Sequence, residues 1–340
     1  MLQGHVFDSF TAKELRESGP HVLSQFLGGM PPAIFLFLTG ITLAFLMDSR
    51  ERAGEAPWQR VGSSLRRAGY LFSLAFLFRL QLWAFAWPKS PWTDLFNVDI
   101  LNSMGLAIGF LSLMAVFQTV ERVRLCAVLC VAIAVASPII SALDWSGIHP
   151  FVRSYIAPDY NAFSFFPWAA YVAFGISAGS ILRLTNMEKT QRLMQWGSLL
   201  GFGLIFGGQY FSNIPYSIYA NSQFWLNSPA LVFMKLGIML LLLSFAYLWT
   251  QYGAAGRWSW VRQLGTTSLL VYWVHTELVY GRWLWTWKEN LSIAQTTVAA
   301  AVVILLMLGL STLRTRLKGW RLAELWSGLR LPAASSAPAE

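Results

Sequence analysis

Charged residues are scarce in this sequence, in which Asp, Glu, Lys and Arg together make up only 12% of 340 residues. An ordinary soluble domain carries about 25% charged residues, because charged side chains stay on the surface that faces water. The shortage therefore excludes a soluble enzyme and a disordered chain. Cysteine is scarce as well, with two residues, so the chain is not a secreted module held together by disulfides.

The residues that bind metals in other proteins are too few and too dispersed here. Cys126 and Cys130 lie one helical turn apart within an apolar run, a spacing typical of neither a zinc site nor a CxxC redox motif. We expect both to be small packing residues. The four histidines are scattered along the chain, so we expect no metal.

Long apolar runs are what the sequence has instead, since 56% of its residues are hydrophobic and the mean hydropathy is +0.50. About 20 apolar residues cross a bilayer, whereas a transmembrane β-barrel would show shorter, alternating segments. The sequence therefore predicts an all-α, polytopic membrane bundle with about nine complete transmembrane helices. The predicted spans are 31–48, 68–87, 98–117, 124–143, 163–182, 193–212, 229–249, 264–285 and 294–312.

Lysine and arginine alternate between the two sides of these spans. Most of them fall in the first, third, fifth and seventh connections and after the last span, and such an excess marks the cytoplasmic side. We expect a cytoplasmic C-terminus, with residues 1–30 on the other side. This pattern accounts for the net charge of +9, so we expect no nucleic-acid partner. We also expect one membrane domain over 1–312, a basic interfacial helix over 313–330 and a disordered tail over 331–340.

Several polar residues fall within or beside the predicted spans. Arg79 lies deep in the second span, where a charge needs a partner or a function. It either pairs with a carboxylate such as Asp99 or contacts substrate. Asp99 and Asn102 open the third span one turn apart, so they either cap that helix or bind substrate. Lys235 lies in the outer half of its span, where it either reaches the surface or serves a transport path.

The stretch 265–283 is the most informative segment of the chain. His275 falls in the middle of this predicted span, and Glu277 and Arg282 follow toward its outer end. A lone histidine in a helix is usually a hydrogen-bonded core residue, but here it shares the span with two charges that also need partners. Both interpretations of His275, a core residue and a catalytic one, stay open.

The N-terminal residues offer a second histidine and a carboxylate. His5 and Asp8 lie three residues apart, and His21 follows before the first predicted span. On a helix His5 and Asp8 would share a face and form a pair in which the carboxylate orients the imidazole and raises its basicity. The alternative, which the sequence alone favours, is a frayed terminus without a role. By the predicted orientation His5, His275 and Asp99 lie at similar depth, in the outer half of the membrane.

Tryptophans gather on this same outer side of the predicted bundle. Such belts usually anchor a protein at the membrane interface, and we expect most of these residues to do so, while a minority would stack on a sugar. The tryptophans concerned are Trp83, Trp87, Trp92, Trp283, Trp285 and Trp287.

Five segments, taken in order, resemble a known family. They are His5-x-x-Asp8, PPAIFLFLTGITLAF (31–45), NVDILNSMGLAIGFLSL (97–113), FPWAAYVAFGISAG (166–179) and GTTSLLVYWVHTELVYGRW (265–283). Their order and spacing resemble the bacterial heparan-α-glucosaminide N-acetyltransferase-like family, which belongs to the transmembrane acyltransferases. The resemblance covers nearly the whole chain, and its specificity lies in the order of the segments.

This resemblance implies a ten- or eleven-helix enzyme that takes an acyl group from coenzyme A at the cytoplasmic face and delivers it to a sugar on the other side. It also implies an essential histidine near the non-cytoplasmic end of the early helices, which His5 matches best and His21 less well. The family's usual helix start, Arg-x-x-x-Asp-x-x-Arg-Gly, is absent from residues 1–30. We therefore expect a chain truncated within its first helix, which would make ten helices in all.

The leading hypothesis is transfer of an acetyl group from acetyl-CoA to an amino sugar or a glycan hydroxyl, in a bacterial inner membrane. The expected catalytic residues are His5, Asp8 and His275. The expected substrate-binding residues are Arg79, Asp99, Asn102, Glu277, Arg282 and His21. Coenzyme A is polyanionic, and the arginines expected to dock it are Arg183 and Arg192.

Two other classes of protein stay open at this point. A transporter or flippase of a polar glycan or lipid precursor would also carry charges near the membrane centre, and a non-catalytic membrane scaffold would use them for folding alone. The expected partners are the lipid bilayer and a saccharide acceptor. The sequence leaves open whether the protein forms a homodimer.

Overall fold

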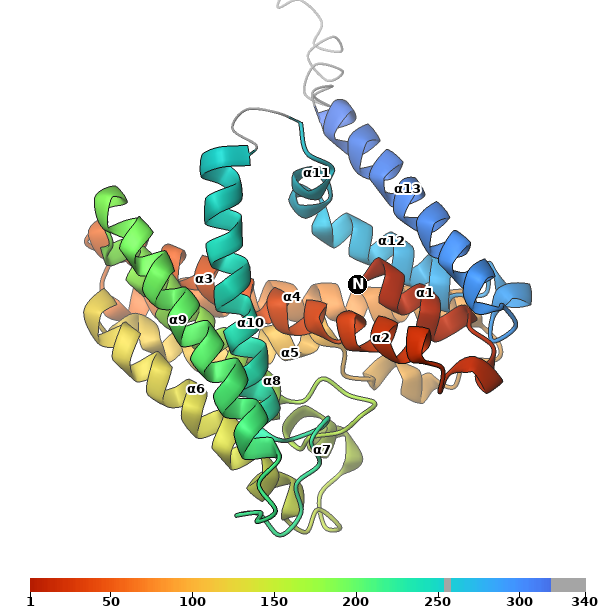
Figure 1. The fold of residues 1–340 in the computed structure, drawn as a ribbon, viewed down its shortest axis with the longest axis horizontal. Helices are drawn as coiled ribbons and strands as arrows, with labels where there is room; N and C mark the ends of the chain where they lie inside the picture. Colours follow the sequence, from red (N-terminus) through yellow and green to blue (C-terminus); the bar gives the residue numbers. More distant parts are fainter. Residues whose placement is uncertain (254–257, 319–340) are drawn as a thin grey trace, which may run out of the picture. The chain divides into compact units, whose positions relative to one another are not determined.

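A computed structural model describes residues 1–253 and 258–318 (Figure 1). The described part is mostly helical and contains no strand, so the predicted all-α class is confirmed. The longer helices follow from long apolar sequences, and α6 (Thr119–Ala142) continues through an interior proline, Pro138. Helix α4 (Pro57–Ala86) begins with proline at its first position, where the missing amide costs nothing.

Seven stretches of the described chain are long and apolar enough to cross a membrane. They are Gly19–Arg52, Pro57–Ala86, Trp92–Val116, Thr119–Ala142, Phe165–Leu184, Pro229–Gly253 and Ile293–Leu317. Each overlaps one of the nine predicted spans, but the count of nine is not confirmed. The two remaining spans, 193–212 and 264–285, differ from expectation for separate reasons.

The segment 193–212 lies in α9 (Met187–Ser212), which is long enough to span but is not among the seven. Two glutamines, Gln195 and Gln209, and several glycines dilute its apolar character. The segment 264–285 is not one helix: α11 (Trp260–Thr266) and α12 (Ser268–Tyr280) are separated at Thr267, whose ψ of 22° is not helical. Neither piece is long enough to cross a bilayer alone.

The chain forms two compact units. The first contains α3 to α10, and the second contains α1 and α11 to α13. The other helices of the two units are α1 Leu2–Phe10, α2 Gly19–Gly28, α3 Met30–Arg52, α5 Ile100–Leu111, α6 Thr119–Ala142, α7 Pro150–Ile156, α8 Phe165–Leu184, α10 Pro229–Leu248 and α13 Ile293–Lys318. Whether residues 1–312 act as one membrane domain stays a prediction.

In the first unit, α8 packs closely against both α3 and α6, and α9 runs beside α10 (Figure 1). The contact between α3 and α8 depends on Gly40 and Gly175, which face each other. A Cβ on Gly40 would collide with the carbonyl oxygen of Val172, and one on Gly175 with that of Phe37. Small residues at such crossings let membrane helices approach closely. On α6, Cys126 and Cys130 are free and buried, which confirms that they are packing residues.

In the second unit, α1 packs against α12 and α13 through an apolar cluster of small and branched side chains. The buried members of the cluster are Val6, Phe7, Phe10, Val271, Val279, Ala299, Ala300, Val303 and Met307. Beyond α1, the backbone pairs with the loop before α13: the amide of Leu291 donates to Phe10 at 2.9 Å, and the amide of Ala12 donates to Leu291 at 3.0 Å. The alternative of a frayed N-terminus is therefore wrong.

The C-terminal predictions are only partly within the described residues. Residues 313–318 continue α13 as helix. The remainder of the predicted interfacial helix, 319–330, and the predicted tail, 331–340, lie outside the described residues.

Candidate functional site

The charge predicted deep in the second span has a partner within the first unit. Arg79 Nε donates to Asp99 Oδ2 at 3.1 Å. Asp99 also caps α5, because its Oδ1 accepts the backbone amides of Leu101 and Asn102. Both structural interpretations, the ion pair and the helix cap, are thus confirmed, and one carboxylate serves both purposes.

Asn102 and Lys235 are also engaged in this unit. The Asn102 amide donates to the hydroxyl of Tyr155 on α7 at 3.0 Å, while its oxygen accepts the backbone amide of Asp99. Lys235 Nζ donates to the carbonyl oxygen of Gly29 at 3.4 Å and lies over the ring of Trp168. A substrate that touches Asn102 would therefore have to replace or extend an existing contact.

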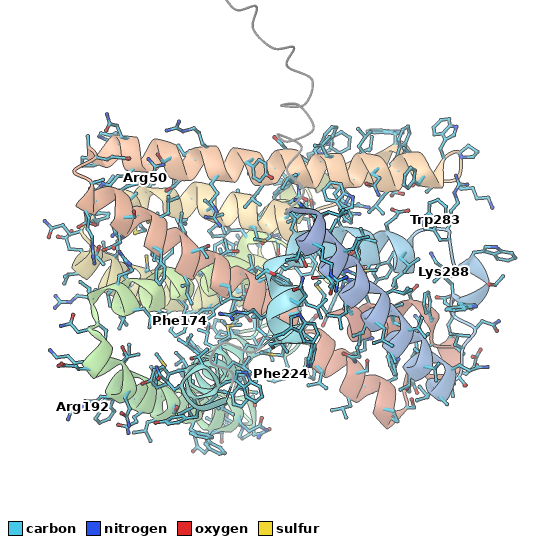
Figure 2. The ribbon with its side chains drawn as sticks, turned by 90° about the horizontal axis from the view of Figure 1, so that it is seen from above. Arg50, Phe174, Arg192, Phe224, Trp283 and Lys288 are labelled. Atoms are coloured by element: carbon cyan, nitrogen blue, oxygen red, sulfur yellow. The ribbon has the colours of Figure 1, made fainter. Side chains whose placement is uncertain are left out.

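The two arginines expected to dock coenzyme A have different surroundings. Arg183, at the end of α8, forms an ion pair with Asp48 of α3 and stacks over Phe45. Arg192, on α9, is exposed, and Figure 2 labels it together with Arg50 of α3.

A network of ion pairs extends from Asp48 between the helix ends of α3, α4, α6 and α8. Asp48 also binds Arg52, and Glu51 binds Arg60 and the fully buried Arg122. Thr119 lies between the two carboxylates, with its hydroxyl oxygen 3.1 Å from Asp48 Oδ1 and 3.0 Å from Glu51 Oε2, so its single hydrogen can bond to either. Four guanidinium groups thus share two carboxylates, which leaves an excess of positive charge at this end of the unit.

Two histidines from opposite ends of the sequence meet in the second unit. His5 Nδ1 and His275 Nε2 are 3.0 Å apart, and the two rings stack with centroids 5.1 Å apart at 19°. His275, on α12, is 0% exposed, whereas His5, on α1, is half-buried. The sequence indicated each histidine separately but contained no signal that they form a pair.

A third contact fixes which nitrogens of this pair carry protons. His275 Nδ1 lies against the carbonyl oxygen of Val271, one helical turn earlier. A carbonyl oxygen only accepts, so His275 Nδ1 must carry a hydrogen, and in the neutral ring Nε2 is then the acceptor. His5 Nδ1 therefore donates to His275, and His5 Nε2 is left with its lone pair. The arrangement presents His5 Nε2 as a base or nucleophile.

Asp8 does not pair with His5, although the sequence led us to expect it. Its Oδ2 accepts the hydroxyl of Tyr280 at 2.8 Å, and no hydrogen bond joins it to His5 anywhere in the described part of the chain. The ring of Tyr280 meets His5 edge-on, with centroids 5.3 Å apart. The predicted His5–Asp8 pair is wrong because α12 packs against α1 and supplies a partner to each residue. Tyr280 was not predicted, and only the packing reveals it.

The other residues predicted from the stretch 265–283 lie at the end of α12. Glu277 is 7% exposed, and its Oε1 accepts the indole Nε1 of Trp283 at 2.9 Å. Arg282 follows the helix and is exposed. His21 lies on α2, buried, and within the described residues its Nδ1 has no hydrogen-bond partner.

Together these features define a class of protein: an integral membrane protein of apolar helices that carries an imidazole pair with a free lone pair. Comparison with known proteins gives the family. Residues 1–210 match the family described as "Heparan-alpha-glucosaminide N-acetyltransferase, catalytic". The match covers more than half of the chain, and the protein belongs to this family of acetyltransferases. The comparisons with curated proteins and with solved structures gave no match.

The matched region contains His5, Asp8 and His21 as well as the Arg79–Asp99 pair. It ends before α10, so the match itself carries no information about His275 or Glu277.

Proposed function

We propose that the protein transfers an acetyl group from cytoplasmic acetyl-CoA to an amino sugar or a glycan hydroxyl on the other side of a bacterial inner membrane. The observation that carries this proposal is the histidine pair, in which His5 Nε2 holds its lone pair free. Family membership supplies the reaction type. The alternation of basic residues supports the orientation, with the C-terminus on the cytoplasmic side.

His5 acts as the general base in this mechanism. Its Nε2 takes the proton from the acceptor amine or hydroxyl as the acceptor's lone pair attacks the thioester carbonyl carbon. The carbon–sulfur bond then breaks, and protonated His5 returns the proton to the departing thiolate. The same lone pair would also accept the acetyl group directly in a two-step route through acetyl-His5. His275 touches no substrate in either route and is a positioning residue for His5.

Acetyl-CoA is the co-substrate in this proposal. The end of the first unit where four guanidinium groups share two carboxylates suits its phosphates, because positive groups outnumber negative groups in this network. Arg192 is exposed and can contact a phosphate directly. Arg183 is already paired with Asp48, so it would bind a phosphate in addition to that carboxylate. Coenzyme A itself supplies the activated thioester.

The remaining expected residues take supporting roles. Three of them already have partners in the protein: Arg79 pairs with Asp99, and Asn102 donates to Tyr155. Their first role is therefore to hold the helices of the first unit together. Any of them would have to give up a present contact in order to stabilise a tetrahedral intermediate. His21 and Arg282 stay candidates for acceptor binding. The partners we propose are the bilayer and a saccharide acceptor.

Labelling with radioactive acetyl-CoA tests the proposal. Membranes that contain the protein should transfer label to D-glucosamine, and His5→Ala should reduce that transfer about 100-fold or more, as expected for loss of a general base. His149→Ala is the matched control, since His149 only caps α7. Undiminished transfer by His5→Ala would remove His5 from its role. Uptake of sugar without any acyl donor would instead identify a transporter, and a protein with neither activity would be a scaffold.

A further inference from the structure

The carboxylate of Glu277 is buried but only half satisfied. Its Oε1 accepts the indole of Trp283, whereas Oε2 has no hydrogen-bond donor within the described part of the chain. The residue is 7% exposed. A buried carboxylate oxygen without a donor loses its hydration and gains no hydrogen bond in return, so this oxygen needs a hydrogen-bond partner that the described residues do not supply.

The position of Glu277 in its helix makes the burial of its charge still less favourable. It lies in the last turn of α12, where the helix dipole is negative and opposes an anion. A glutamine would keep the bond from Trp283 and avoid the charge. A purely structural role therefore does not account for a glutamate at this position.

The chain after α12 makes room for this carboxylate. A Cβ on Gly281 would come within 2.5 Å of Glu277 Oε1 and would also collide with the carbonyl oxygen of the same residue. Lys288 Nζ donates to the carbonyl oxygen of Tyr280. Burial lowers the pKa of Lys288, and the charge of Glu277 opposes that shift. Lys288 therefore interacts with the charge of Glu277 at a distance, and no ion pair joins the two among the described residues.

Trp283 adds an apolar surface beside the carboxylate. Its nitrogen is tied to Glu277, yet the side chain is 59% exposed. Figure 2 labels Trp283 and Lys288 in the segment that follows α12. An exposed indole whose nitrogen is bonded to a carboxylate suits the stacking of a sugar ring.

We propose that Glu277 is a specificity-determining residue, which binds the ammonium or amine group of an amino-sugar acceptor through Oε2 while Trp283 stacks on the sugar ring. A cation is the ligand that compensates a buried carboxylate best, because the bond is charge-assisted and neutralises the site. The inference rests on the proposed function and deepens it by assigning the recognition of the acceptor amine to Glu277, a residue outside the region that the family match covers. Glu277 and His275 both belong to the short helix α12.

The test compares Glu277→Gln with the wild-type protein on D-glucosamine and D-glucose. Glu277→Gln keeps the acceptor for Trp283 and should raise the KM for D-glucosamine about 10- to 100-fold, the value of a charge-assisted hydrogen bond, with kcat nearly unchanged. Gly281→Ala, which displaces the carboxylate, should do the same. Glu289→Gln is the matched control, since Glu289 pairs on the surface with Lys13 and Arg16, and its KM should not change.

Saturation-transfer NMR of D-glucosamine and D-glucose, without any acyl donor, provides a readout independent of catalysis. The wild-type protein should bind D-glucosamine in preference to D-glucose, and Glu277→Gln should lose that preference. Equal binding of both sugars by the wild type, or an unchanged preference in Glu277→Gln, would overturn the inference. If the wild type prefers D-glucosamine but transfers no acetyl group, then the proposed function fails while the binding site stands.

Discussion

Replacing His275 separates its role as a positioning residue from a role in packing. Its Nε2 is the acceptor for His5 Nδ1, at 3.0 Å. In His275→Leu this buried acceptor is lost. No hydrogen bond then keeps the proton of His5 on Nδ1 rather than on Nε2. In His275→Gln the amide oxygen can accept in its place. The two variants therefore differ in a hydrogen bond to His5 while both remove the imidazole.

The magnitude follows from that single hydrogen bond. A buried donor left without its acceptor costs about 1–3 kcal/mol, and each 1.4 kcal/mol corresponds to a factor of about ten. We expect His275→Leu to lower kcat about 10- to 100-fold without raising the KM for the acceptor, because His275 does not touch it. His275→Gln should recover most of the loss, to within about tenfold of the wild type.

The assay pairs steady-state acetyl transfer with modification of His5 by diethyl pyrocarbonate, which reacts with an unprotonated imidazole nitrogen. The reagent should modify His5 more slowly in His275→Leu than in His275→Gln. Thermal unfolding in detergent reports whether each variant is folded. The reasoning would be refuted if folded His275→Leu kept the wild-type kcat, or if both variants lost activity and His5 reactivity equally.

Three further predictions concern stability. Arg79→Ala leaves the buried Asp99 without its cation and should destabilise the protein by about 3 kcal/mol. The double variant Arg79→Met with Asp99→Asn should lose less unfolding free energy than the two single variants, Arg79→Met and Asp99→Asn, lose in sum. Strictly additive losses in detergent unfolding would contradict the ion pair. Gly40→Leu forces α3 away from α8 and should lower the melting temperature by several degrees, whereas Gly62→Leu, where a Cβ meets open space, should have little effect; equal shifts would argue against the close crossing. The hydrogen bond from Lys13 and the charges of Lys13 and Arg16 hold the pKa of Glu289 below its usual value, so its contribution to stability is present above the unfolded pKa and is lost as the pH falls through the folded pKa. Glu289→Gln should therefore lower the melting temperature slightly at pH 7 and by less as the pH is lowered, and a loss independent of pH would exclude the ion pairs as its cause.

The sequence allowed the ion pair of the first unit to be predicted because a charge deep in an apolar span must find a partner. Arg79 and Asp99 were the available residues, and the structure joins them. The helix class and seven of the spans followed from apolar length alone. The break at Thr267 did not, because a threonine within an apolar run does not by itself interrupt a helix.

The site of the second unit could be predicted only as a set of residues. His5, His275 and Asp8 were all indicated, but the expected pairing of His5 with Asp8 came from spacing within one helix. The actual partner is 270 residues away in sequence. It is brought near by the apolar cluster that joins α1 to α12 and α13, and no local pattern encodes such a contact.

The most direct test of the account is acetyl transfer across a sealed membrane. The full chain, reconstituted in proteoliposomes that enclose D-glucosamine, is supplied with labelled acetyl-CoA from outside, and the proteoliposomes whose cytoplasmic face points outward are isolated first. The account predicts that labelled N-acetylglucosamine accumulates inside, and that His5→Ala reduces this product about 100-fold or more. Label found only on sugar added to the outer side, or sugar that leaves the vesicles without being acetylated, would contradict it.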